Sequence, residues 1–359
     1  MRARGIVMMD LNAIWQDYGL DKLEEGMQQL FPQNTMSLDK LLVQVMEGDI
    51  FGALAGLFTG VITDFVHQIS GVRNVFIWLL VLGIVSTLLT HFVEIFDRHQ
   101  VADISFYFMY LLFSVVLLKC FYQAGQTAVE TMENVVLFIR LMIPTYLISV
   151  GVSTGVVTAS ASYQLMLLVI YGVQNLLAQG IIPLIYSMCM LVVINGVWVE
   201  EKLTLLIDLL EKGIGWVLKG VVGVVTGLSI FQALITPVVD SAKTSVLQKV
   251  VSAIPGVGNT ANGVVELVLG SAVVIKNSIG VVLLLLFLVM CIAPLIKIAV
   301  IAVMLKCAAA FMGIVSDKRI TACANRTGDA GLLLLRTVGT AMLLFIISIA
   351  VVTASARIQ

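Results

Sequence analysis

The sequence predicts an all-α protein that crosses a membrane several times, that is, a polytopic helical membrane protein. Apolar residues fill 60% of its 359 positions, charged residues only 12%, and the mean hydropathy is +1.05. A water-soluble core of this size does not need so many apolar residues. The apolar residues also form runs of about 20, the length at which an α-helix spans the hydrocarbon core. Composition and run length together predict about eight transmembrane helices.

The charge distribution divides the chain into four regions. Residues 1–74 hold five Lys or Arg and nine Asp or Glu, so this amphipathic N-terminal region is acidic, and we expect it outside the cytoplasm. Residues 75–236 carry six predicted spans, 237–278 form an amphipathic hairpin, and 279–359 carry the C-terminal spans. The membrane part is only mildly basic and the formal net charge is −1, which argues against nucleic-acid binding.

Two amphipathic helices are predicted in the N-terminal region. The first begins after Ser37, a residue type that caps helices, and places apolar residues on one face: Leu38, Leu41, Leu42, Val45 and Met46. The second follows Gly48 and carries Gly52, Gly56 and Gly60 at every fourth position. Small residues at this spacing let helix backbones approach each other in lipid, so we predict a helix-packing surface there.

The predicted spans are the apolar runs between charged or small polar residues. They are 75–96, 104–122, 135–159, 163–178, 181–199, 214–235, 279–300 and 331–353. The stretch 141–199 contains no charged residue and suits three crossings, with breaks expected at 160–162 and 180–183. The run 279–315 suits one span with an apolar extension or two spans. One is preferred, because two would put the basic loop that follows outside the cytoplasm.

Loop charges predict the orientation of these spans. Three loops fall together on one face and are rich in basic residues. They are 97–103, 200–212 and 316–336, with Arg98, Lys202, Lys212, Lys318, Arg319, Arg326 and Arg336. The loop predicted on the other face, 123–134, carries only Glu130 and Glu133. Because cytoplasmic loops are enriched in Lys and Arg, both termini are predicted to lie outside the cytoplasm.

Two more pairs of small residues lie in the predicted spans. They are Gly151 with Gly155 and Gly223 with Gly227. Like the first stripe, they are candidates for helix packing. The spacing does not identify the partner helix, so contacts within the chain and contacts between subunits both stay open.

The hairpin 237–278 is the candidate assembly or conduit element. A linker of this length would be polar throughout, whereas both predicted helices of this hairpin carry apolar faces that must be buried. A polar arc that holds two lysines could face anionic lipid, a partner or an aqueous path. The residues singled out are Asp240, Lys243, Lys249, Val250, Pro255, Gly256, Gly258 and Asn259.

Nothing in the sequence points to catalysis, to a cofactor or to a metal. No zinc-protease, serine-hydrolase or phosphate-binding motif occurs. His91, Glu94, Asp97 and His99 lie together at the end of the first predicted span, where a charged interfacial turn is a simpler explanation than a metal site. The five cysteines are widely spaced and are interpreted as small buried hydrophobes. We therefore expect that the protein is not an enzyme.

Charged residues near the ends of the spans are interpreted as snorkelling, in which a long side chain reaches the interface. Lys119, Arg140 and Lys219 fit this interpretation. Lys297 and Lys306 are nine residues apart, half a turn on a helix, so they point to opposite faces. Lys297 is interpreted as snorkelling, and Lys306 as facing the cytoplasm or the protein.

The order of these features resembles the stage III sporulation protein AE family of endospore-forming bacteria. The resemblance runs from about Ser37 to the C-terminus. It is carried by ETMENV at 130–135, IPTY at 143–146, NGVW at 195–198, EKL at 201–203, ITPVVD at 235–240, PGVGN at 255–259, KCAAA at 306–310 and SDKR at 316–319. It departs at the N-terminus, where the apolar run at 6–9 is shorter than the core of the signal peptide that family members carry.

The resemblance implies a multi-pass subunit of a channel-like complex in the mother-cell membrane around the forespore. Such a complex meets a partner in the forespore membrane and is needed for forespore development and late forespore gene expression. Its expected partners are membrane lipids and the other membrane subunits, in an oligomeric assembly. The alternative is a stand-alone secondary transporter or permease, a class that commonly shows inverted repeats and broken helices. No repeat between halves is evident here, and 180–183 and 255–259 could be breaks.

Overall fold

The protein is all-α throughout the part that the computed structural model describes. That part is residues 38–49, 51–52, 55, 74, 76–85, 87–88, 92, 99–154, 157–198, 202–252, 258–315 and 317–355. Its elements are α3 (Leu38–Met46), α5 (His99–Thr154), α6 (Val157–Leu176), the π-helical turn η2 (Leu177–Ile181), α7 (Ile182–Asn195), α8 (Thr204–Ser252), α9 (Gly258–Val315) and α10 (Lys318–Ser355). The predicted fold class is confirmed.

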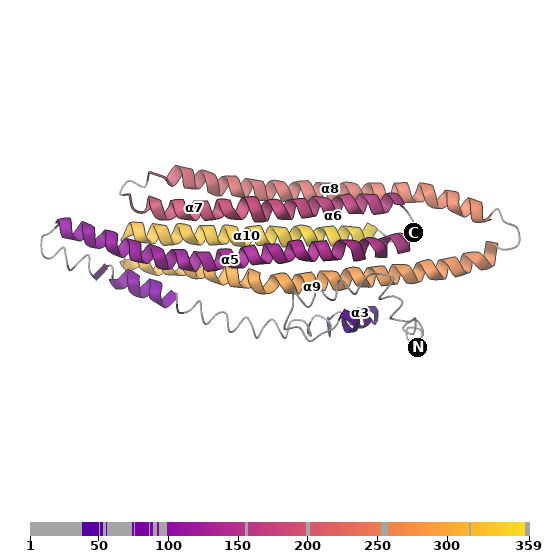
Figure 1. Cartoon of the computed structure of the whole chain (residues 1–359), viewed down its shortest axis with the longest axis horizontal. Coiled ribbons are helices and arrows are strands. Elements are labelled where there is room, and N and C mark those ends of the chain that lie inside the picture. The colour runs from indigo at the N-terminus through magenta and orange to yellow at the C-terminus, as the bar shows by residue number, and fades with distance from the viewer. Residues whose placement is uncertain are drawn as a thin grey trace.

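The long helices run side by side in an elongated antiparallel bundle (Figure 1). α6, η2 and α7 follow one another without a break, so they form one helical segment. α10 lies in the middle of the bundle, where it contacts α5, α6, α7, α8 and α9. At one end of the bundle α7 ends and α8 begins, and α9 ends and α10 begins; we call it the turn end. α8 and α9 extend furthest at the other end (Figure 1).

The short helix α3 confirms the first predicted amphipathic segment. Leu41 and Val45 of its apolar face are buried, and α3 contacts α9. It ends in a Schellman motif: the N–H of Gly48 donates to the carbonyl of Val45, and the N–H of Asp49 donates to the carbonyl of Gln44. Gly48 has φ +87°, a conformation that glycine adopts at no steric cost. Ser37 lies outside the described residues.

The helices are longer than the predicted spans. The loop predicted at 123–134 is wrong, because α5 continues through it as one helix of 56 residues. The residues there are compatible with a helix. The loop was predicted because they are polar, and polarity alone does not distinguish a loop from an exposed helix face. The break predicted at 160–162 lies inside α6, and 180–183 holds the end of the π-helical turn rather than a loop. The run 279–315 lies within a single helix, α9, in which Pro294 is accommodated.

The predicted number of eight spans is not confirmed. Over the described residues, four helical stretches are long and apolar enough to cross a membrane: Ile104–Met142, Leu168–Asn195, Ser278–Ile314 and Lys318–Ile347. Each exceeds the roughly 20 residues that a hydrocarbon core requires. The protein is therefore a membrane protein whose helices continue beyond one bilayer thickness.

Two hydrophobic clusters hold the helices together. One lies toward the turn end and is built from α5, α7, α9 and α10, with large buried side chains such as Tyr110, Phe113 and Phe121. The other lies further along the bundle, where Phe138, Phe287 and Phe345 meet from α5, α9 and α10. The ring centroids of Phe287 and Phe345 are 4.0 Å apart, and Phe138 stands 5.7 and 5.8 Å from them.

Candidate functional site, a charged cluster around the last helix

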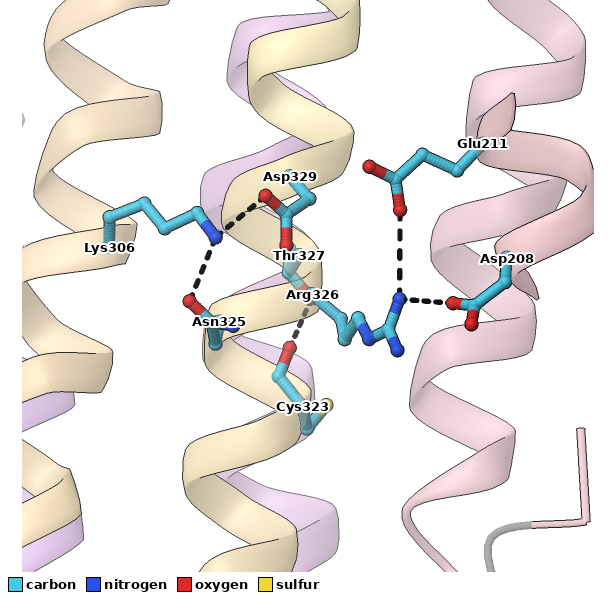
Figure 2. Close-up of polar contacts among 8 residues, drawn as sticks. All are labelled: Asp208, Glu211, Lys306, Cys323, Asn325, Arg326, Thr327 and Asp329. Carbon is cyan, nitrogen blue, oxygen red and sulfur yellow. Dashed lines mark hydrogen bonds and ion pairs between the residues drawn. The ribbon is translucent and has the colours of Figure 1, made fainter. Parts of the chain in front are cut away.

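Charged side chains from three helices meet around the first half of α10. Figure 2 shows α10 between the other two, with Lys306 reaching across from α9 on one side and Asp208 and Glu211 from α8 on the other. Arg326 and Asp208, for example, are 118 residues apart in the sequence and form a direct contact. Such pairs are expected where charges lie inside an apolar bundle, because an unpaired charge there is costly.

Lys306 joins α9 to α10. Its Nζ forms an ion pair with Asp329 Oδ1 at 2.7 Å and donates a hydrogen bond to Asn325 Oδ1 at 2.8 Å. Asp329 and Asn325 are four residues apart, so they lie on one face of α10 and can hold the same ammonium group. Lys306 was predicted to face the cytoplasm or the protein, and the structure shows that it faces the protein.

Arg326 joins α10 to α8. Its NH1 lies 2.5 Å from Asp208 Oδ1 and 3.6 Å from Glu211 Oε2. Each of the three side chains is about a third exposed, at 32%, 35% and 34%. Glu211 and Asp208 are three residues apart and present both carboxylates to one guanidinium group, whose fork of donors suits two acceptors.

Two glycines bring α10 close to α9 beside these pairs. A Cβ at Gly331 would lie 3.1 Å from Ala302 Cβ and 3.3 Å from its Cα, and a Cβ at Gly328 would lie 3.0–3.3 Å from the stem of Lys306. Thr327, directly before Gly328, is fully buried and donates its hydroxyl to the carbonyl of Cys323 at 2.8 Å. This close approach sets the distance that the Lys306 ion pair spans.

The turn between α7 and α8 is fixed by a second set of polar contacts. Asn195 accepts a hydrogen bond from the N–H of Leu203 at 2.7 Å and donates one to Thr204 Oγ1 at 3.1 Å. Tyr110 of α5 donates to the carbonyl of Val193 at 2.7 Å, and its hydroxyl occupies the space that a Cβ at Gly196 would need. The NGVW motif at 195–198 therefore has a structural role in this turn.

A small pocket opens beside this turn, between α7, α8 and α10. Asn195, Thr204, Arg319, Cys323 and Arg326 are among the residues that line it. Arg326 and Asn195 are already engaged, and the guanidinium of Arg319 stacks on Phe106, 3.6 Å from the ring centroid. No group of His, Cys, Asp and Glu among the described residues could hold a metal ion. The cluster is thus a set of interhelical ion pairs.

The structure places the predicted packing glycines in different surroundings. Gly52 donates its N–H to Asp49 Oδ1 at 2.9 Å. Gly223 and Gly227 are exposed on α8, and nothing lies within 4 Å of a Cβ built at either position, so they pack on no described helix of this chain. Gly151 lies near the end of α5. Gly56, Gly60 and Gly155 lie outside the described residues.

The predicted hairpin residues lie on the extensions of α8 and α9. Asp240, Lys243, Lys249 and Val250 belong to the last turns of α8, and Gly258 and Asn259 begin α9. Pro255 and Gly256 lie outside the described residues. The charged cluster was missed, except for Lys306, because a single sequence does not show which distant residues meet. The nearest signal was Asp329 and Arg326 within an otherwise apolar run.

Replacing Arg326 with alanine is expected to lower stability by about 1–3 kcal/mol, the range for leaving partly buried charged partners unpaired. Unfolding can be followed by the reaction of the four buried cysteines with a thiol-specific fluorophore. Arg336→Ala is the matched control, because Arg336 is exposed on the same helix and forms no ion pair with the described residues. Equal losses in the two variants would contradict the role given to Arg326.

The chain is similar to known proteins along most of its length. Residues 36–356 match the family described as stage III sporulation protein AE. Stage III sporulation protein AE of Bacillus subtilis (strain 168) is 22% identical over 288 residues, which cover 80% of this chain and 72% of that protein. No solved structure matches. A match along nearly the whole chain shows membership, so this chain belongs to the stage III sporulation protein AE family.

Proposed function

We propose that the protein is a membrane subunit of a channel-like complex that links the mother cell and the forespore during sporulation. The observation that carries this proposal is the family match over residues 36–356, which supports a role in sporulation. The proposed location is the mother-cell membrane around the forespore. The proposed partners are lipids and the other membrane subunits of the complex.

The chemistry of the described residues suits an assembly subunit. Lys306, Asp329, Arg326, Asp208 and Glu211 pair with one another across helices around α10. Exposed glycines on α8 offer a surface where another helix can approach closely. We therefore propose that the protein is not an enzyme and that it works through contacts with other chains.

Affinity purification from sporulating cells tests the proposal. An epitope-tagged chain, extracted in a mild detergent, is expected to bring down other sporulation membrane proteins in fixed ratio. An untagged strain is the control for non-specific capture. Deletion of the gene should block late forespore gene expression, and the tagged chain should restore it.

The outcome that would contradict the proposal is a chain that purifies alone and moves a solute across vesicles by itself. That result would favour the stand-alone transporter. The π-helical turn η2 is an irregularity within a described candidate span that such a mechanism could use.

A further inference from the structure

The long helices are longer than a bilayer is thick, so the bilayer can surround only part of their length. Charged residues stand at two levels on four of the helices. The first level, at the turn end, holds Asp103, Lys202, Asp317 and Lys318. The second holds Lys119, Lys219, Lys297 and Arg336. The paired positions are 16 to 20 residues apart along the chain, or about 24–30 Å of helix, which is about one hydrocarbon thickness.

The outer surface between the two levels is apolar. Large side chains point away from the bundle on α5, α7, α8 and α9 there. Examples are Phe108 (67% exposed) on α5, Leu209 (66%) and Trp216 (78%) on α8, and Phe311 (59%) on α9. A water-soluble surface rarely gathers so many large apolar side chains, whereas acyl chains cover them at no cost.

Five of the charged residues between the two levels pair with one another across helices. Asp208, Glu211, Lys306, Arg326 and Asp329 all take part in the ion pairs between α8, α9 and α10. An apolar exterior around paired charges is the arrangement expected inside a bilayer. Lys212 is exposed, and its long side chain can extend toward the turn end.

The exposed face of α5 changes its chemistry at the second level. Before Lys119 this face carries Ile104, Phe108, Leu111 and Val115, all exposed. After it, the same face carries polar residues at helical spacing, also exposed: Gln123, Gln126, Glu130 and Glu133. Carboxylates that face outward do not belong in hydrocarbon, so α5 leaves the bilayer near Lys119.

A second interval could in principle hold the bilayer, because 220–239, 277–296 and 337–356 contain no charged residue. The aromatic contact between Phe138, Phe287 and Phe345 fixes the level of α5 within that interval. Phe287 is near the middle of its charge-free stretch, so Arg140, two residues after Phe138, would lie near the centre of the bilayer. Arg140 is exposed there and contacts only the neutral Tyr171 among the described residues, and the exposed carboxylate of Glu133 would lie five residues from Phe138. This position is therefore less favourable than one whose charged groups mostly pair with each other.

We infer that the bilayer surrounds only the turn-side part of the bundle, between the two charged levels, where its apolar surface binds lipid acyl chains. The rest of α5, α6, α8, α9 and α10 projects from the membrane. From Lys219 to Ser252 this projecting part extends by about 50 Å of helix. This position of the bilayer goes beyond the proposed function. It would hold even if the protein acted alone.

Cysteine accessibility tests the inference on the full chain in liposomes that have been permeabilised, so that the reagent reaches both sides of the membrane. Single cysteines are placed in a chain in which the exposed Cys307 is replaced by Ser. A charged, impermeant maleimide is expected to label Glu133→Cys and Val224→Cys at least about tenfold faster than Leu209→Cys and Phe311→Cys, because a charged reagent is excluded from hydrocarbon. All four replaced side chains are exposed, so burial within the protein does not explain a difference.

Labelling of the Phe311 cysteine at the rate of the Glu133 cysteine would overturn the inference, and so would protection of the Val224 cysteine. After denaturation in SDS, one label more than in the Cys307→Ser parent, which keeps the four buried cysteines, shows that each introduced thiol is intact. Leu206→Cys and Ile314→Cys repeat the test on the lipid side if a first variant fails to elute as a single folded species. Association with other sporulation proteins is measured separately, so a failure there would affect the proposed function and leave this inference standing.

Discussion

Replacing Phe287 with alanine is expected to lower the stability of the bundle by about 3–5 kcal/mol, the range for removing a buried aromatic side chain. Phe287 is fully buried and contacts the rings of Phe138 and Phe345, so its loss leaves a cavity where α5, α9 and α10 meet. Neighbouring rings cannot close that cavity without moving a helix.

The loss can be measured as the shift in an SDS or urea titration of the purified protein. Phe311→Ala is the matched control, since Phe311 lies on the same helix and is 59% exposed. We expect the control to change stability by less than about 1 kcal/mol. A similar loss in both variants would mean that the aromatic cluster does not hold the three helices together.

Replacing Gly331 with leucine is expected to separate α9 from α10 and to lower stability by about 3 kcal/mol, near the upper end for overpacking. A Cβ at this position would meet the backbone of Ala302 at 3.3 Å, and backbone atoms cannot rotate away as a side chain does. The same displacement would pull Lys306 from Asp329, which are 2.7 Å apart.

Gly339→Leu is the control on the same helix, because nothing lies within 4 Å of a Cβ there. Both variants gain the same helix propensity relative to glycine, so the difference between them reports packing alone. Thermal unfolding monitored through the buried cysteines provides the measurement. If Gly331→Leu is as stable as Gly339→Leu, the close approach of α9 and α10 is not required.

The sequence alone predicted the helical class well, because hydropathy reports which residues avoid water. It failed on the boundaries for the same reason. Gln123, Gln126, Glu130 and Glu133 were assigned to a loop, yet all are compatible with a helix and all lie on its exposed face. Between them Ala124, Ala128 and Met132 remain buried, so one helix presents two chemistries that an average over the window cannot separate.

The packing glycines show a related limit. Gly223 and Gly227 follow the pattern of small residues at every fourth position. Within the described part of this chain, however, nothing lies within 4 Å of a Cβ built at either of them. Close contacts with α9 are made at Gly331, which faces Ala302, and at Gly328 three residues earlier, which faces the stem of Lys306. Spacing marks where a helix can be approached, but the partner is set by tertiary structure. The partners of Lys306 and Arg326 were hidden for the same reason.

The position of α10 in the middle of the bundle has a consequence for synthesis. Among the described helices it is the last to leave the ribosome, and it contacts the segments α5, α6, α7, α8 and α9. At typical rates of elongation its 38 residues take about 2–8 s to make. During that time Asp208, Glu211 and Lys306 have been synthesised but their partners have not, so the nascent chain holds unpaired charges and an open apolar groove. A stop codon before Lys318 would make that temporary state permanent, because the carboxylates of Asp208 and Glu211 and the ammonium of Lys306 would then never meet their partners on α10.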